Sequence, residues 1–137
     1  MSNTDAIRWQ QRLENFSKAL SQLEAACAQE EYSNLERAGL VQLFECSFEL
    51  SWKVLKDLLF YEGYDVNSPR EAIRQSFEVV YIDQQDCKLF LETLGKRNLL
   101  THTYEEKIGE EAVPLIKEQY YPLMGRLYQT LEQKRTT

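Results

Sequence analysis

Apolar residues recur along the chain with helical spacing, and the strict alternation typical of strands is absent. From residue 5 to about 29 the apolar side chains return every three or four residues, which predicts a helix with one narrow apolar stripe: Trp9, Leu13, Phe16, Leu20, Leu23 and Cys27. Ser33 and Glu36 form a capping box that predicts the start of a second helix. Gly63 supplies the left-handed residue that ends this helix near position 62.

The second helix is apolar over more than half of its circumference. Projected at one hundred degrees per residue, this wide arc comprises Val41, Leu43, Phe44, Phe48, Leu50, Trp52, Val54, Leu55, Leu58 and Leu59. One neighbouring helix cannot bury so wide an arc. Either the helix lies at the centre of a bundle or part of its surface meets a second subunit, and on this ground we expect a homodimer.

Two further helices are predicted before residue 105. Ser68-Pro69-Arg70-Glu71 combines an N-cap, a first-turn proline and a glutamate, which predicts a short third helix that buries Ile73, Phe77 and Val80. A fourth helix is expected to begin after Asp83, with these apolar residues buried: Cys87, Phe90, Leu91 and Leu94.

A last helix is predicted over 112–133, after the polar stretch 105–111. Its apolar residues are Leu115, Ile116, Tyr120, Met124, Leu127 and Leu131, and Pro122 is expected to kink it. The chain lacks internal repeats and linkers, so we expect one domain over 1–137. The predicted fold is an all-α, antiparallel up-down bundle of four main helices plus a short one.

Composition and charge narrow the classes of function. The formal charge of −6 argues against a general nucleic-acid binder, which needs dense Lys and Arg. Three widely spaced cysteines fit reduced thiols in the cytoplasm, and the longest apolar run is too short to cross a bilayer. With one histidine in the chain, we expect no metal site and no cofactor.

The only histidine lies in the segment Arg97-Asn98-Leu99-Leu100-Thr101-His102-Thr103-Tyr104. Arginine can hold a phosphate through two hydrogen bonds, histidine can transfer a proton near neutrality, and a tyrosine hydroxyl can be a nucleophile or a modified group. These roles make Arg97 and His102 candidate catalytic residues and Tyr104 a candidate modification or substrate-binding residue. The alternative is a helix end at which Arg97 bridges carboxylates and His102 caps carbonyls. The residues alone leave both interpretations open.

Four polar residues are candidate supports of this motif. Asn98 could orient Arg97 or a phosphate through its amide, or form a local hydrogen bond at the helix end. Glu45, Glu49 and Lys53 lie on the polar face of the second helix, where they could simply be solvated. If that face lies opposite the motif, Glu49 could orient His102 and Lys53 could attract phosphate.

The chain lacks the sequence signature of a nucleotidyltransferase. That chemistry needs a Gly-Ser phosphate turn followed by an Asp-x-Asp metal pair, and no glycine here precedes a serine and no two aspartates are spaced by two. The chain is therefore not expected to be a nucleotidyltransferase itself.

The motif and the second helix together resemble a known family. Arg97-Asn98 with His102-Thr103-Tyr104, and upstream Phe44-Glu45, Phe48-Glu49-Leu50, Trp52-Lys53 and Leu55-Lys56, are similar to the nucleotidyltransferase substrate-binding protein family of the HEPN superfamily. The resemblance runs from about Arg8 to Leu131. It implies a helical bundle that dimerises and a minimal nucleotidyltransferase as partner, typically encoded beside it.

The same resemblance implies two functions of different classes. The first is a substrate-binding or partner subunit of a two-component nucleotidyltransferase system, in some relatives a toxin-antitoxin pair in which the partner adds AMP to the tyrosine that matches Tyr104. The alternative is a metal-independent ribonuclease toxin that cuts RNA with Arg97 and His102. A nucleotide or an RNA would then be a ligand, and whether the chain is an enzyme stays open.

Overall fold

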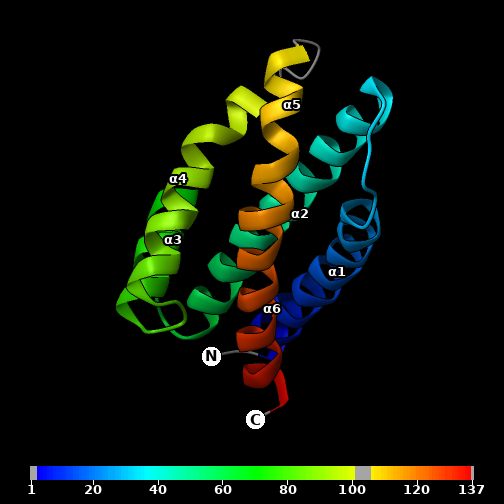
Figure 1. Ribbon diagram of the computed structural model, residues 1–137. Helices are drawn as coiled ribbons and strands as arrows, with labels where there is room; N and C mark the ends of the chain where they lie inside the picture. The colour runs from blue at the N-terminus through cyan, green and yellow to red at the C-terminus, as the bar shows by residue number, and fades with distance from the viewer. Residues whose placement is uncertain (1–2, 101–105, 137) are drawn as a thin grey trace.

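The computed structural model describes residues 3–100 and 106–136, and every element in these two ranges is helical. The elements are α1 (Asn3–Cys27), α2 (Asn34–Tyr61), α3 (Pro69–Glu78), α4 (Gln84–Leu100), α5 (Glu106–Leu115), the π-helical segment η1 (Ile116–Tyr120) and α6 (Tyr121–Thr136). The helices α1, α2, α4 and the rod formed by α5, η1 and α6 alternate in direction, and both chain ends lie at one end of the bundle (Figure 1). This arrangement confirms the predicted all-α bundle of four main helices plus a short one.

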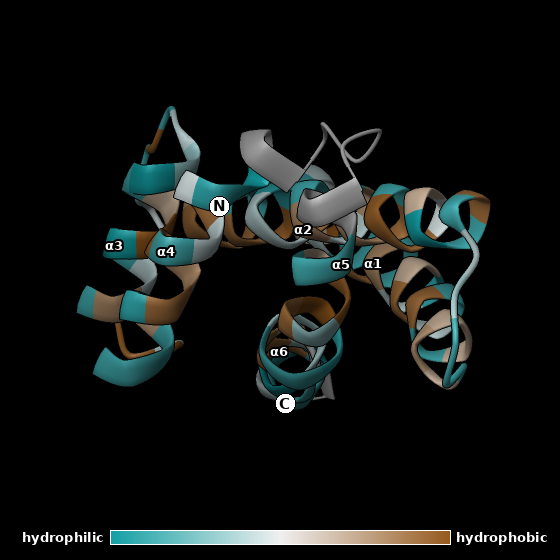
Figure 2. Ribbon diagram, turned by 45° about the horizontal axis from the view of Figure 1, so that its top comes forward, coloured by the Kyte–Doolittle hydropathy of each residue, from teal (hydrophilic) through white to brown (hydrophobic). Residues whose placement is uncertain are grey.

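Helix α2 is the central element of the bundle. It packs against α1, α3, α5, η1 and α6. Its buried residues are Leu40, Val41, Phe44, Ser47, Phe48, Ser51, Val54, Leu55, Leu58 and Leu59. Apolar and polar residues alternate along the surrounding helices (Figure 2), as expected where each helix buries one face. The central position of α2 within one chain buries seven of the ten residues of its wide apolar arc, and Leu43, Leu50 and Trp52 are half-buried, so the homodimer stays a prediction.

Both ends of α2 are fixed as the sequence predicts. The Ser33 hydroxyl accepts a hydrogen bond from the Glu36 amide at 3.1 Å, and the Glu36 carboxylate accepts one from the Ser33 amide at 2.9 Å. At the other end, Gly63 has a φ of 101°, and the Tyr64 amide donates to the Leu59 carbonyl at 2.8 Å. This pattern is a Schellman motif, which places glycine in the left-handed conformation after the helix.

Helix α3 is shorter than its apolar pattern predicts. Ile73 is buried as expected, but Phe77 is 37% exposed and Val80 is 82% exposed, so these two predictions are wrong. The reason is that α3 ends at Glu78 and Val80 takes a left-handed φ of 68°, which breaks the helical spacing before residue 80. Tyr81 becomes buried instead, and its hydroxyl donates to the Glu62 carboxylate at 2.5 Å.

The last helical rod begins earlier than predicted and changes its pitch before Pro122. Helix α5 begins at Glu106, inside the polar stretch that was expected to precede the helix, because glutamate is a good helix former that is also favoured near a helix N-terminus. Pro122 has no amide hydrogen to donate to the carbonyl four residues earlier. The turn before it is π-helical, with the Tyr121 amide bonded to the carbonyl of Ile116. The expected distortion thus takes the form of a wider helical turn.

The three cysteines are free thiols. Cys87 is buried and Cys27 is half-buried, and in both cases burial raises the pKa of the thiol. Cys46 is exposed on α2. Within residues 3–100 and 106–136, none of the helices has the length and apolar content needed to cross a membrane.

Candidate functional site

Arg97 lies in the last turn of α4 and binds the middle of α2. Its Nη1 donates a hydrogen bond to Oε2 of Glu49 at 2.9 Å. The Arg97 side chain is 25% exposed and that of Glu49 is 42% exposed, so the ion pair lies at the protein surface with one side open to solvent. The sequence placed Arg97 in the candidate motif and Glu49 in the supporting face, and the structure brings the two together.

A buried aromatic ring lies beneath the Arg97 guanidinium. The guanidinium carbon is 5.7 Å from the centroid of the Phe48 ring, a distance at which a cation interacts favourably with a ring face. Phe48 has no exposed surface, and its ring lies 6.4 Å from Phe90 of α4 and 6.1 Å from Phe44, measured between centroids. Phe44 stacks in turn on Tyr120 at 5.2 Å. The aromatic core therefore connects α2, α4 and η1 directly below Arg97.

A shallow cavity of about 250 Å³ opens beside the ion pair. Its walls are formed by Gln42, Glu45, Cys46, Glu49 and Arg97. The first four residues lie on one face of α2, because steps of three and four residues follow the helical repeat. Two carboxylates here face one guanidinium, so the cavity carries a formal excess of negative charge.

Burial changes the proton affinity of Glu45, one of the two carboxylates of this cavity. Burial raises the pKa of Glu45, and the nearby positive charge of Arg97 opposes this shift only in part. A carboxyl group with a raised pKa exchanges protons closer to neutrality than an ordinary glutamate. Glu45 is thus a candidate group of this cavity for giving or taking a proton.

Lys53 continues the same face of α2 one turn beyond Glu49. Its Nζ lies 3.8 Å from Oε1 of Glu49, the i,i+4 ion pair that the sequence spacing predicts. Glu49 is therefore shared between two cations, Arg97 on one carboxylate oxygen and Lys53 on the other.

The structure describes part of the predicted motif. Arg97, Glu45, Glu49 and Lys53 lie together along one side of α2. Asn98 follows Arg97 in the last turn of α4, but its side chain lies outside the described residues, as do His102 and Tyr104 as a whole.

Sequence reasoning missed two residues of the cavity wall. Gln42 and Cys46 both line the cavity, and the Gln42 amide lies 3.8 Å from the Cys46 sulfur. Their helical spacing from Glu45 and Glu49 was visible in the sequence. Neither side chain carries a charge, however, so nothing in the pattern distinguished them from solvated positions.

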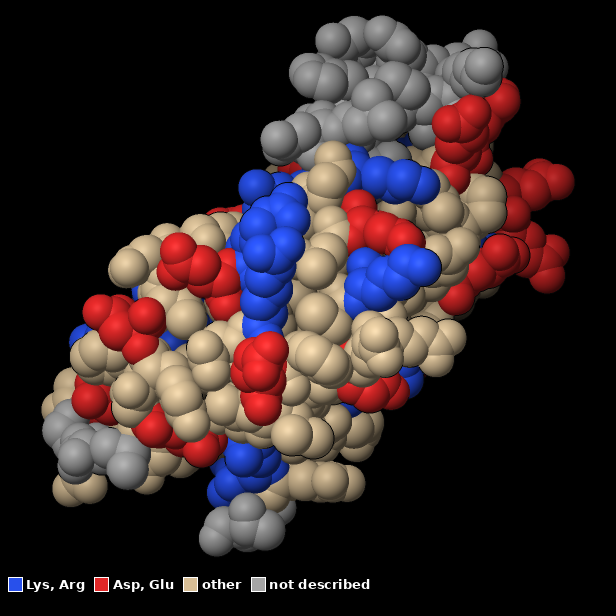
Figure 3. Space-filling view, turned by 90° about the vertical axis from the view of Figure 1, so that its left-hand side faces the viewer, with Lys and Arg blue, Asp and Glu red and all other residues tan. Residues whose placement is uncertain are grey.

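The face of the molecule beside α3 and α4 carries charges of both signs. Figure 3 shows Lys and Arg side chains lying next to Asp and Glu side chains across this face. Such mixing produces a weaker long-range potential than a patch of one sign. The described part of this face therefore does not have the uniformly basic surface that binds a phosphate backbone strongly.

The fold and this cavity define a class of protein: an all-α bundle with a polar cavity on its central helix. The chain belongs to the nucleotidyltransferase substrate binding protein like family, whose model matches residues 11–133. A protein from Thermus thermophilus, known from its crystal structure, is 32% identical over 85% of this chain and 98% of that chain, with a TM-score of 0.79. No curated protein matched the chain.

Proposed function

We propose that this chain is the substrate-binding partner subunit of a two-component system whose other member is a minimal nucleotidyltransferase. The family name implies a nucleotidyltransferase as partner. The observation that carries the proposal is the Arg97–Glu49 ion pair, which fixes the end of α4 immediately before the segment that contains His102 and Tyr104. In this role the chain supplies the acceptor group and its partner supplies the metal-dependent transfer chemistry.

The acceptor that we propose is Tyr104. The phenol oxygen of Tyr104 forms a bond to the α-phosphorus of ATP, the bond from that phosphorus to pyrophosphate breaks, and the phenol proton passes to a base in the partner's site. Arg97 lies seven residues earlier in the chain, and its ion pair with Glu49 holds the end of α4 that precedes this tyrosine. In a toxin-antitoxin pair this modification switches the chain off.

The charges around Arg97 favour this role over RNA cleavage. A ribonuclease needs a positive group free to stabilise the developing charge on phosphorus. Here the Arg97 guanidinium is already paired with Glu49, and Glu45 adds a second carboxylate to the same cavity. A bound RNA backbone would therefore meet two carboxylates beside Arg97. Modification of Tyr104 does not require a phosphate to bind in this cavity.

The test is to purify the chain alone and together with the minimal nucleotidyltransferase encoded beside it. After incubation with ATP and magnesium, intact-mass measurement is expected to show one added AMP on the chain in the presence of the partner. The variant Tyr104→Phe is expected to remain unmodified. Tyr64→Phe removes a hydroxyl from an exposed tyrosine on the connection after α2 and is expected to be modified like the wild type.

Each function predicts a different result in these assays. The absence of a stable complex, together with an unchanged mass in the presence of ATP, contradicts the partner role. RNA cleavage by the purified chain that is lost in His102→Ala and in Arg97→Ala would establish the ribonuclease instead. Cleavage that persists in His102→Ala would point to a contaminating nuclease.

A further inference from the structure

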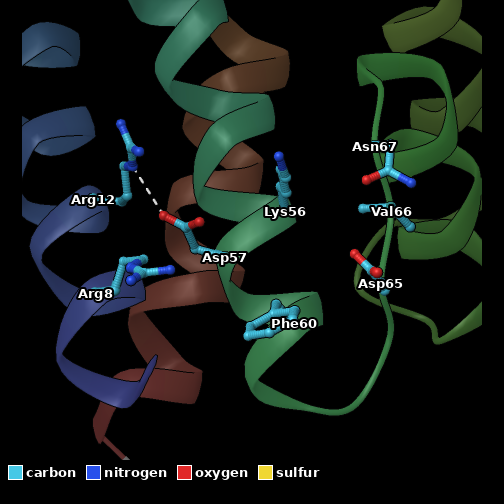
Figure 4. A pocket seen from close by; sticks show the side chains of 8 residues that line it. All are labelled: Arg8, Arg12, Lys56, Asp57, Phe60, Asp65, Val66 and Asn67. Atoms are coloured by element: carbon cyan, nitrogen blue, oxygen red, sulfur yellow. Dashed lines mark hydrogen bonds and ion pairs between the residues drawn. The ribbon is translucent and has the colours of Figure 1, made fainter. Parts of the chain in front are cut away.

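A second cavity, larger than the one beside Arg97, lies toward the other end of α2. Its volume is about 340 Å³, within the roughly 300–1,000 Å³ typical of small-molecule sites. The lining residues are Arg8, Arg12, Lys56, Asp57, Phe60, Asp65, Val66 and Asn67. Figure 4 shows that they come from three segments: α1 on one side, α2 in the middle and the connection between α2 and α3 on the other. Asp57 lies eight positions after Glu49 on α2, about 12 Å along the axis, so this cavity is distinct from the Arg97 site.

The walls of this second cavity are held in place by the protein itself. Arg12 Nε donates to Oδ2 of Asp57 at 2.9 Å, and the Asp57 side chain is only 12% exposed, which ties α1 to α2. On the other side Val66 is buried, and the Asn67 amide donates to the Glu71 carboxylate at 2.9 Å. The cavity therefore has a defined shape before any ligand enters.

Two cations of this cavity have no ion-pair partner among the described residues. The charges of Arg12 and Asp57 cancel in their ion pair. The remaining charged residues of the lining are two cations, Arg8 and Lys56, and one exposed carboxylate, Asp65. Arg8 lies one turn before Arg12 on the same face of α1, and Figure 4 shows its guanidinium directed toward the space between α1 and α2. A guanidinium and an ammonium group at one concave surface are suited to bind a phosphate, the first through paired hydrogen bonds and the second as a point charge.

An exposed aromatic ring lies beside these cations. Phe60 is 49% exposed in the last turn of α2, one turn after Lys56, and it lines the cavity. A nucleobase that stacks on an aromatic side chain gains about 1–3 kcal/mol, whichever base it is. Asp65 and Asn67 on the opposite wall provide polar side chains of the kind that bind sugar hydroxyls.

From this juxtaposition we infer that the cavity binds a nucleoside phosphate, with the phosphate on Arg8 and Lys56 and the base on Phe60. The inference goes beyond the proposed function and does not depend on it, because none of these residues belongs to the Arg97 site. We expect the ligand to be small, because the cavity is lined on three sides and both of its unpaired cations are needed to bind one phosphate group.

The experiment titrates the purified chain with AMP, GMP, CMP and UMP separately, using calorimetry and amide chemical shifts in NMR. At least one nucleotide is expected to bind with a Kd of about 1 mM or tighter and to shift the amide signals of the cavity segments. Arg8→Ala and Lys56→Ala are each expected to weaken binding about tenfold, and Phe60→Ala to weaken nucleotides while leaving ribose 5-phosphate unchanged. Adenosine, which lacks the phosphate, is expected to bind more weakly than AMP.

Matched variants separate this cavity from the rest of the surface. Lys18→Ala removes an exposed cation of α1 that does not line the cavity and is expected to bind like the wild type. Arg97→Ala removes the cation of the other site and tests whether the nucleotide binds there instead. No binding by any of the four nucleotides, or binding that is lost in Arg97→Ala but kept in Arg8→Ala, would overturn the inference. Equal binding of ribose 5-phosphate and AMP would overturn the assignment of a nucleoside. All of these outcomes are measured without the nucleotidyltransferase, so they do not depend on whether the complex forms.

Discussion

Arg97 and Glu49, which lie 48 residues apart in sequence, form a 2.9 Å ion pair that joins the last turn of α4 to the middle of α2. The pair is half-exposed, so its contribution to the free energy of unfolding is small, of the order of 1 kcal/mol or less. Its position suggests a different role. It holds the only arginine of the candidate motif at one place, immediately before the segment that carries His102 and Tyr104.

The first prediction separates positioning from stability. Glu49→Gln keeps the shape of the side chain and removes its charge, so Arg97 loses its ionic partner. We expect the free energy of unfolding, measured in urea, to change by less than about 1 kcal/mol. Partner-dependent modification of the chain is expected to slow about tenfold, because the guanidinium is no longer fixed.

Lys53→Gln is the matched control for this variant. It removes the other cation of Glu49, which lies 3.8 Å away, and leaves the Arg97 contact intact. We expect modification at the wild-type rate. Equal slowing in both variants would show that the charge of the α2 face matters and that the position of Arg97 does not.

A second prediction concerns the ring beneath Arg97. Phe48 and Phe44 are both fully buried in α2, but only Phe48 lies under the guanidinium, whereas Phe44 stacks on Tyr120. We expect Phe48→Leu and Phe44→Leu to cost similar amounts of stability, about 1–2 kcal/mol each in urea unfolding. Modification by the partner is expected to slow in Phe48→Leu well beyond the effect of Phe44→Leu. Parallel losses in the two variants would mean that Phe48 acts on stability alone.

The sequence predicted those parts of the fold that depend on local chemistry. The capping box at Ser33 and the glycine at position 63 fixed both ends of α2, because each residue type is specific to its place in a helix. The width of the apolar arc on α2 indicated that several partners cover it, yet it could not say whether they come from one chain or two. The packing of α1, α3, α5, η1 and α6 on α2 shows that most of the arc is buried within one chain.

The candidate sites depended on contacts between distant segments. Helical spacing placed Glu45, Glu49 and Lys53 on one face, but it could not show that Arg97 returns to that face from α4. The second cavity was missed altogether. Arg8 and Lys56 are 48 residues apart, and in the sequence each looks like an ordinary solvated cation. Only the packing of α1 beside α2 brings both to one cavity.

A third prediction follows from the raised pKa of Glu45. Burial raises this pKa above its ordinary value of 4.5 in the folded protein only, so the unfolded chain loses this proton at lower pH than the folded one. The stability cost of ionised Glu45 is therefore absent below pH 4.5 and grows as the pH rises through the folded-state pKa. Glu45→Gln removes this cost and is expected to raise the free energy of unfolding near neutrality and to leave it unchanged at pH values below the ordinary pKa.

Urea unfolding of wild type and Glu45→Gln, at pH values from below 4.5 to neutrality, measures the difference in their free energies of unfolding. Glu30→Gln removes an exposed carboxylate between α1 and α2 and controls for the change in net charge. We expect it to show no such rise near neutrality. A stability gain for Glu45→Gln that is the same at every pH would contradict a cause in ionisation.

The last prediction compares two helix ends of the same type. Helices α2 and α3 both end in a Schellman motif, with the Tyr64 amide bonded to Leu59 in one and the Tyr81 amide bonded to Ser76 in the other, each at 2.8 Å. The left-handed residue is Gly63 in the first motif, with φ 101°, and Val80 in the second, with φ 68°. A β-branched side chain is strained in this conformation, and Val80 is 82% exposed, so it has little packing to lose.

Val80→Gly is therefore expected to stabilise the protein by about 1 kcal/mol in urea unfolding, since the left-handed conformation costs an ordinary residue roughly 1–2 kcal/mol. Val80→Ala keeps a Cβ atom and is expected to gain less than the glycine variant. Gly63→Ala introduces the same strain at the end of α2 and is expected to destabilise by about 1 kcal/mol. If Val80→Gly instead lowers the free energy of unfolding, the exposed valine must contribute to stability by a route other than its backbone conformation.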